Sequence, residues 1–219
     1  YVVQWDLDYD GVYEHTETPA MNGQVKSPTF SFGATGQYNI SARLYDSISK
    51  QGTSRTLPIK VSNLPPEADA GPDRVEAEDS IVVFNGSESF DTASDLAAGL
   101  EFRWTFGDGG SSQWSGSPIA AHAYPVKGNY LVTLDVRDND NAESTDTLTV
   151  NVYNVRPNAS APSTLFGVED YPLLFTGSGL DTENDTDELE FRWDFGDGIQ
   201  SEWIQNPEIE HTYRQSGNY

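Results

Sequence analysis

The stretch that decides the fold is residues 102–109, FRWTFGDG, which returns at residues 191–198 as FRWDFGDG. A more divergent copy, VQWDLDYDG, occupies residues 3–11. In each copy apolar and polar side chains alternate around a central tryptophan, and a period of two is typical of a strand with one buried face. The Asp-Gly that follows favours a tight hairpin turn, because both residues tolerate positive φ. We therefore predict three tryptophan strands, each lying in the core of its own sandwich, with Trp5, Trp104 and Trp193 at their centres.

A second motif follows each copy at a similar distance. It consists of an aromatic residue, a glycine four residues later and a tyrosine two residues after the glycine: Phe32, Gly36 and Tyr38; Tyr124, Gly128 and Tyr130; Tyr213, Gly217 and Tyr219. We expect Tyr130 to be buried, with its hydroxyl bonded to nearby backbone as in the tyrosine corner of immunoglobulin-like sandwiches. His122 and His211 stand two residues before the aromatic, where the first copy has Phe30. Exchange with phenylalanine indicates packing or turn bonding rather than a catalytic or metal site.

Together these motifs resemble the PKD (polycystic kidney disease) domain family. The third copy follows that pattern most literally, the second departs from it at Thr105, and the first departs most. The resemblance implies an all-β fold of tandem immunoglobulin-like (PKD-type) antiparallel β-sandwiches. It also implies an extracellular protein in which such domains serve as spacers, adhesion modules or appendages of secreted enzymes.

The copies divide the chain into three PKD-like repeats, which we call the first (residues 1–64), second (65–153) and third (154–219) repeat. The first repeat lacks its early strands and the third lacks its late strands, whereas the second is complete. We expect a fragment of a longer array, with exchange of strands with a neighbouring chain as the alternative. The joints contain proline and little glycine, which favours semi-rigid connections.

Composition excludes several classes of function. The formal net charge is −23, from 12 basic and 35 acidic residues, which disfavours nucleic acid and an anionic membrane surface as partners. The absence of cysteine excludes disulfides, thiol catalysis and zinc–thiolate sites, and no apolar run is long enough for membrane insertion. The acidity serves solubility, divalent-cation binding or both. Four Asn-x-Ser/Thr sequons weakly favour an extracellular or cell-surface location, at Asn39, Asn85, Asn158 and Asn184.

The strongest candidate for chemistry is residues 6–17, DLDYDGVYEHTE, which match the twelve-residue calcium loop D-x-D-x-D-G-x5-E. Alternate carboxylates can converge on one cation, the glycine permits the sharp turn, and the distal glutamate can close the shell. We predict calcium as the cofactor and a metal site formed by Asp6, Asp8, Asp10 and Glu17. No helices flank the loop, so a solvated acidic hairpin is the alternative.

Other acidic clusters carry weaker signals. For the loops before the tryptophan strands we expect exposed acids rather than a calcium site; these are Asp91 and Asp95, and Asp181, Asp185 and Asp187. Asp138 and Asp140 are expected to form a strand-ending turn. Trp114 and Trp203 follow the central tryptophans by ten residues. They either close the sandwich edge or, if exposed, stack on a sugar or a partner protein.

No residue pattern indicates catalysis: there is no Gly-x-Ser-x-Gly elbow, and the acids lie on turns of repeats without a cleft-forming insertion. We predict a non-catalytic extracellular structural and adhesive module of a cell-surface layer, filament or sheath, rigidified by calcium. Its expected partners are other copies of itself or neighbouring surface proteins. The alternative is a PKD-type binding appendage of a secreted hydrolase that contacts polysaccharide or protein.

Overall fold

The computed structural model describes residues 1–18, 29, 31–46, 48–182, 185 and 188–219. In this part of the chain the regular secondary structure is almost entirely β-strand, with one short helix, α1 (Ala93–Ala98). The chain forms two compact units. One contains Tyr1–Glu67, Ser89–Glu101 and Val136–Ser144, and the other contains Ala68–Glu88, Phe102–Asp135 and Thr145–Tyr219. The predicted all-β class of immunoglobulin-like sandwiches is confirmed.

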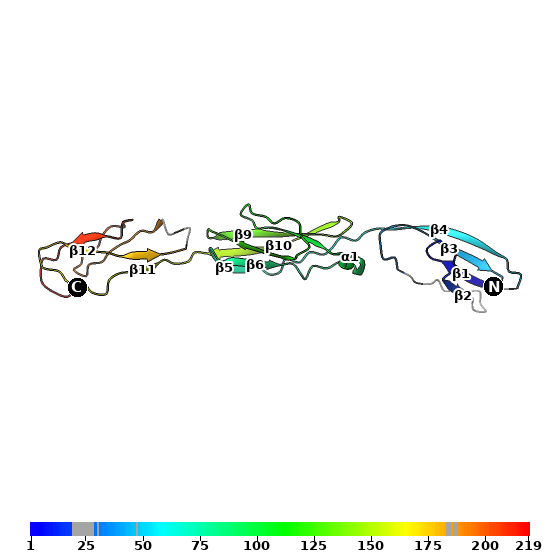
Figure 1. The fold of residues 1–219 in the computed structure, drawn as a ribbon, viewed down its shortest axis with the longest axis horizontal. Coiled ribbons are helices and arrows are strands. Elements are labelled where there is room, and N and C mark those ends of the chain that lie inside the picture. Colours follow the sequence, from blue (N-terminus) through cyan, green and yellow to red (C-terminus); the bar gives the residue numbers. More distant parts are fainter. Residues whose placement is uncertain (19–28, 30, 47, 183–184, 186–187) are drawn as a thin grey trace. The chain divides into compact units, whose positions relative to one another are not determined.

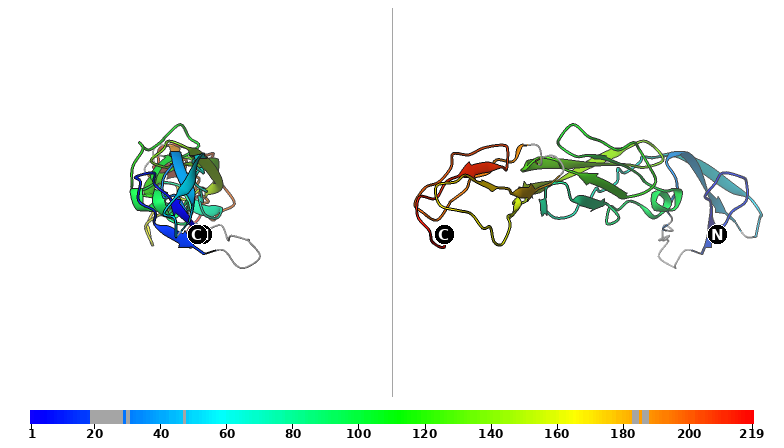
Figure 2. Two further views of the ribbon diagram at one scale, coloured as in Figure 1. Left: turned by 90° about the vertical axis from the view of Figure 1, so that its right-hand side faces the viewer. Right: turned by 60° about the vertical axis from the view of Figure 1, so that its left-hand side comes forward.

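The first repeat forms one antiparallel sheet with the strand order β2-β1-β3-β4. Its strands are β1 (Val2–Asp6), β2 (His15–Glu17), β3 (Gly36–Tyr45) and β4 (Gly52–Val61). β3 and β4 run side by side over their full length (Figure 2). The acidic loop of residues 7–14 connects β1 to β2, so the sheet positions the candidate calcium ligands at one end of a hairpin.

The second repeat contains a larger sheet and a two-stranded ribbon. The sheet has the order β5-β10-β9-β7, with β5 and β10 parallel. Figure 1 labels β5, β9 and β10 of this sheet. Its strands are β5 (Arg74–Ala77), β7 (Glu101–Thr105), β9 (Gly128–Arg137) and β10 (Glu143–Tyr153). The ribbon consists of β6 (Ile81–Asn85) paired with β8 (Ile119–Ala123). Alternate side chains of these strands form the core, including Val82, Phe84, Phe102, Trp104, Val132, Leu134, Leu148 and Val150.

The third repeat contains two short ribbons among its described residues. β11 (Asn158–Ser160) pairs with β13 (Ser178–Leu180), and β12 (Leu173–Phe175) pairs with β14 (Ile209–His211). The motif FRWDFGDG does not form a continuous strand here. It forms two isolated β-bridges, Phe191 with Ile204 and Asp194 with Gln200. Among the described residues of this repeat, Phe195 is the buried apolar side chain.

The three central tryptophans differ in burial. Trp104 is 1% exposed, as predicted, and packs against Phe84 with ring centroids 5.3 Å apart. Trp5 and Trp193 are only half-buried, so the expectation of three equivalent core tryptophans is wrong. Trp193 packs against Phe175 with ring centroids 5.6 Å apart, whereas Trp104 and Leu134 both lie beside Gly86 in the second repeat. Burial of each tryptophan depends on strands from elsewhere in its repeat.

The tyrosine motif forms the same hydrogen bond in all three repeats. Tyr130 donates its hydroxyl to the carbonyl of Val126 at 2.6 Å, and Tyr38 and Tyr219 make the equivalent bond four residues upstream at 2.8 and 2.9 Å. The predicted hydrogen bond is confirmed, but Tyr130 is half-buried rather than buried. The fully buried tyrosine is Tyr124, whose pKa is raised by burial to about 12. Its hydroxyl donates to the carbonyl of Phe106 at 2.9 Å.

Candidate metal centre

Four carboxylates converge on the loop between β1 and β2. Asp6, Asp8, Asp10 and Glu14 each place one oxygen so that the four atoms lie within 4.8 Å of one another. Oxygens on opposite sides of a calcium ion bound at about 2.4 Å are themselves separated by about 4.8 Å. The spacing of the four side chains therefore suits a single coordination shell.

Local backbone geometry produces this convergence. Tyr9 and Gly11 have φ of 64° and 93°, so the chain turns sharply between the three aspartates. The aspartates also accept hydrogen bonds from the loop backbone: Asp10 N–H donates to Asp8 Oδ1 at 3.3 Å, and Val12 N–H donates to Asp10 Oδ1 at 2.7 Å. Such side-chain-to-backbone bonds are typical of aspartates in turns.

Asp6 is the unusual member of the group. It is 3% exposed at the end of β1, and its Oδ2 accepts a hydrogen bond from the Gly11 N–H at 3.1 Å. Its other oxygen, Oδ1, is buried and has no hydrogen-bond partner among the described residues. A buried carboxylate oxygen without a partner is costly. A cation held by this oxygen and the exposed side chains of Asp8, Asp10 and Glu14 would compensate that cost.

The structure brings together three of the four predicted ligands and replaces the fourth. Glu17 lies in β2 opposite Val3, and its Oε1 is 3.5 Å from His15 Nε2. In a strand three residues span about 10 Å, so Glu17 is carried away from the turn. Glu14 closes the group instead, and its Oε2 accepts a hydrogen bond from the Leu7 N–H at 2.7 Å. The prediction chose Glu17 because the distal glutamate stands at that position in a helix-flanked calcium loop. In a hairpin, the acid that immediately precedes the second strand stays beside the turn, and that residue is Glu14.

Two acids in the loop of the second repeat are buried, contrary to the expectation of exposed acids. Asp91 and Asp95 are 3% and 8% exposed, and Asp95 is the buried residue of α1. Asp91 Oδ1 accepts a hydrogen bond from the Thr92 N–H at 2.6 Å, and Asp95 Oδ2 accepts one from the Thr92 hydroxyl. Burial raises the pKa of Asp91, and the negative charges of Asp95 and Asp138 add to the rise.

The remaining acids have mainly structural roles. Asp138 forms the predicted turn, since its Oδ1 accepts hydrogen bonds from the N–H groups of Asp140 and Ala142 at 2.8 and 2.9 Å. Asp181 is half-buried, and its Oδ1 accepts a hydrogen bond from the Thr182 N–H at 2.9 Å. Asp185 is half-buried as well. Asp187, Phe30 and the sequon residue Asn184 lie outside the described residues.

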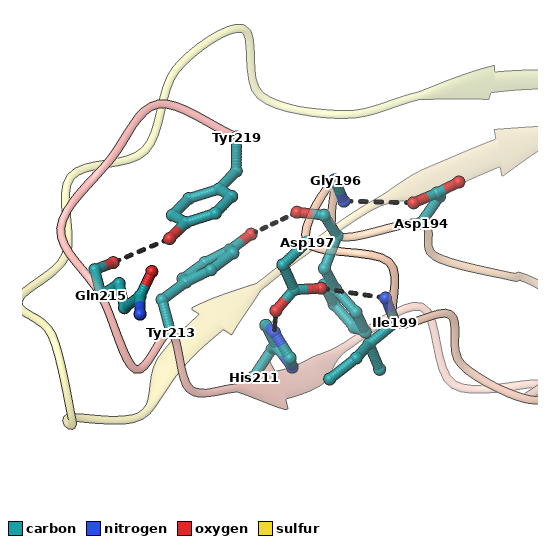
Figure 3. Close-up of polar contacts among 9 residues, drawn as sticks. Asp194, Gly196, Asp197, Ile199, His211, Tyr213, Gln215 and Tyr219 are labelled. Atoms are coloured by element: carbon teal, nitrogen blue, oxygen red, sulfur yellow. Dashed lines mark hydrogen bonds and ion pairs between the residues drawn. The ribbon is translucent and has the colours of Figure 1, made fainter.

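The two histidines bond to the turns after the tryptophan strands, which confirms the predicted role. His122 Nε2 donates to Asp108 Oδ2 at 2.6 Å, and its ring stacks on Phe106 with centroids 4.2 Å apart. The third repeat reproduces the pair, with His211 Nε2 donating to Asp197 Oδ2 at 2.7 Å (Figure 3). Counted from the tryptophan, the first repeat has Tyr9 at the place of this aspartate, and its own Asp-Gly pair, Asp10 and Gly11, comes one residue later. The calcium-type loop therefore stands where the other repeats have an aspartate–histidine pair.

The two additional tryptophans have different surroundings. Trp114 is half-buried beneath Arg103, whose guanidinium carbon lies 4.7 Å from the ring centroid. Asp135 holds that guanidinium through hydrogen bonds of 2.8 and 3.1 Å. Trp203 is 60% exposed. The edge-closing interpretation therefore suits Trp114 better, whereas Trp203 offers an open aromatic surface.

The fold and these sites define a tandem β-sandwich module whose polar clusters lie in turns. Two family models described as PKD domain match residues 63–152 and 158–219. The chain therefore belongs to the PKD domain family and carries two PKD domains in tandem. PKD domains are usually non-catalytic modules and are typically extracellular. No helix in the described part of the chain is long and apolar enough to cross a membrane.

Solved structures similar to this chain include PKD domains. The PKD1 domain of Vibrio anguillarum Epp is 26% identical with a TM-score of 0.32, over 42% of this chain and 96% of that one. The PKD domain of an M14-like peptidase from Thermoplasmatales archaeon SCGC AB-540-F20 is 22% identical with a TM-score of 0.35, over 42% and 98%. A structure described under carbohydrate-binding modules from the β-sandwich superfamily is 26% identical with a TM-score of 0.36, over 52% and 48%. The chain thus spans about half the length of that last relative.

Proposed function

We propose that this chain is a non-catalytic, extracellular structural and adhesive module of a cell-surface layer, filament or sheath, and that calcium stiffens its first repeat. The observation that carries the proposal is the convergence of four carboxylates, one of which, Asp6, has a buried Oδ1 without a hydrogen-bond partner among the described residues. A tandem array of sandwiches suits a spacer, because each repeat adds length.

Calcium would hold the β1–β2 hairpin closed. Asp6 ends β1, Glu14 immediately precedes β2, and Asp8 and Asp10 lie in the turn between them. Without a cation these four carboxylates repel one another. With one, their oxygens would share a single positive partner, and the two strands would be cross-linked at the turn. Extracellular calcium modules bind with dissociation constants of about 10⁻⁴–10⁻³ M, so the first repeat would respond to millimolar calcium.

The test compares two glutamates in the same hairpin. Thermal unfolding of the 219-residue chain is followed by circular dichroism in EDTA and in millimolar calcium. Calcium should raise the melting temperature of the first repeat in the wild type and in the Glu17→Gln variant. It should not do so in Glu14→Gln or in Asp8→Asn/Asp10→Asn. When the free calcium concentration is about 100 times the dissociation constant, binding stabilises the folded state by about 2.7 kcal/mol. An equal calcium response in Glu14→Gln, or no response in the wild type, would contradict the proposed site.

A second candidate function is that of a binding appendage of a secreted hydrolase. The exposed ring of Trp203 favours it, because an open aromatic face can stack on a sugar ring or anchor a partner protein. Affinity electrophoresis in gels that contain soluble polysaccharides would detect such binding. A retardation that Trp203→Ala abolishes, and that Trp114→Ala leaves intact, would support this function over a purely structural one.

A further inference from the structure

The second repeat carries an apolar surface that its own core does not use. β6 and β8 form an antiparallel ribbon in which Val82 and Phe84 face inward and are 1% exposed. The alternate side chains of β6 face outward, and so do the β8 residues that pair with them. They are Ile81, Val83 and Asn85 on β6, and Ile119, Ala121 and Ala123 on β8. Ile81, Val83 and Ile119 are 76%, 49% and 57% exposed. We call these six residues the ribbon face.

The fold of the repeat does not require this composition. In the third repeat the equivalent ribbon pairs Leu174 with Glu210, where the second repeat pairs Val83 with Ala121. Glu210 on β14 and Glu208, which immediately precedes that strand, are both exposed, at the positions of Ala121 and Ile119. The same ribbon is therefore stable with acids on its outer face. The uncharged face of the second repeat needs an explanation other than the stability of the domain.

The relief of the ribbon face is self-complementary. The branched side chains of Ile81 and Val83 form a ridge along β6, and Ala123 and Ala121 lie directly opposite them on β8 and form a furrow. If two copies meet face to face about a two-fold axis that runs along the strands, β6 of each copy lies over β8 of the other, and the ridge of each copy fits the furrow of the other. Such an isologous contact uses the same patch twice. Small side chains in the furrow let the ribbons approach to the spacing of packed sheets, about 10 Å.

Charge argues that the partner is a second copy. The chain has a formal net charge of −23, so contact between two copies through most faces would place carboxylates opposite carboxylates. None of the six residues of the ribbon face is charged. It therefore allows two acidic copies to approach without direct repulsion, and it buries apolar side chains in the process.

We propose that the ribbon face of the second repeat binds the ribbon face of a second copy of this chain and forms a two-fold dimer. The inference rests on the proposed function, in which copies of the module are joined in a surface assembly. It adds the residues through which the copies meet. Because the chain carries a net charge of −23, salt should strengthen the dimer by screening the repulsion between copies.

The first experiment measures the monomer–dimer equilibrium of the 219-residue chain by sedimentation equilibrium at several concentrations of NaCl. Val83→Glu introduces a charge into the ridge, and Leu174→Glu places the same charge at the equivalent, equally exposed position of the third repeat, 49% in both cases. The wild type and Leu174→Glu should dimerise alike. Val83→Glu should dissociate at least about tenfold more readily, as expected for a charge buried at the centre of an interface. Far-UV circular dichroism verifies that each variant is folded.

The second experiment uses the absence of cysteine from the chain. A Val83→Cys chain is mixed with an Ala121→Cys chain under mild oxidation. A disulfide between the two chains reports that the ridge of one copy contacts the furrow of another. The mixed disulfide dimer should form faster than either homodimer. A Val75→Cys chain, whose cysteine is on β5 and replaces a side chain that is 70% exposed, is the control partner and should not be trapped by Ala121→Cys.

The outcomes separate this inference from the proposed function. A wild-type chain that remains monomeric at high salt, or a dimer that Val83→Glu does not weaken, would overturn the ribbon-face dimer. So would trapping of the Val75→Cys control at the same rate. None of these three results affects the calcium response of the first repeat. Conversely, the ribbon-face dimer could form equally well in EDTA while calcium leaves the melting temperature of the first repeat unchanged. That pair of results would overturn the calcium site alone.

Discussion

Replacement of Trp104 by alanine should unfold the second repeat. Trp104 is 1% exposed, packs on Phe84, and donates its indole N–H to the carbonyl of Pro118 at 3.3 Å. Burial of a tryptophan removes about 150–250 Å² from water, which at about 25 cal/mol per Å² corresponds to about 4–6 kcal/mol. Alanine retains part of this, and large-to-small core changes of this kind cost about 3–5 kcal/mol. The lost hydrogen bond adds about 1 kcal/mol.

This loss is comparable to the whole stability of a small domain, about 5–15 kcal/mol. Amide hydrogen exchange measured by mass spectrometry resolves the repeats separately. In Trp104→Ala the amides of β9 should lose most of their protection, whereas those of β3 in the first repeat keep theirs. Trp193→Ala is the matched control: its tryptophan is only half-buried, so a smaller loss, confined to the third repeat, is expected. Unchanged protection of β9 in Trp104→Ala would refute the assignment of this tryptophan to the core.

Two further predictions follow from the hydrogen bonds in the turns. Tyr130→Phe should lower the free energy of unfolding of the second repeat by about 0.5–1.5 kcal/mol in urea titrations, because the bond from its hydroxyl to the backbone is lost; a neutral substitution would show that this bond contributes nothing. The hydrogen bond from His211 lowers the pKa of Asp197. Its stabilising contribution is therefore complete above the unfolded value of about 3.9 and is lost as the pH falls through the lower folded pKa. The melting temperature of the third repeat should thus decline less between about pH 5 and 2 in Asp197→Asn than in the wild type, and equal declines would contradict the pairing.

The strand pattern could be read directly from the sequence because it depends on neighbours in the chain. A period of two around Trp104 determines which side chains share a face, and the buried and exposed residues of β7 alternate as that period requires. The Gly-x-Tyr spacing likewise predicted the hydrogen bond of Tyr130, since donor and acceptor are only four residues apart. Such features are local, and repetition of the motif made them visible.

The membership and accessibility of the sites depended on the tertiary structure, because they are set by distances through space. A calcium-loop pattern selected Glu17, but the hairpin extends β2 away from the turn and leaves Glu14 beside the aspartates. An acidic loop suggested exposure of Asp91, yet its side chain is only 3% exposed in the folded chain. Alternation alone could not show that the apolar residues beside Val83 face solvent, because each strand has two faces and only the packing of the other sheet decides which one becomes the core. The sequence by itself determined the tryptophan strands of the first two repeats, the repeats themselves and the family, whereas the folded chain decided which side chains meet and which remain exposed.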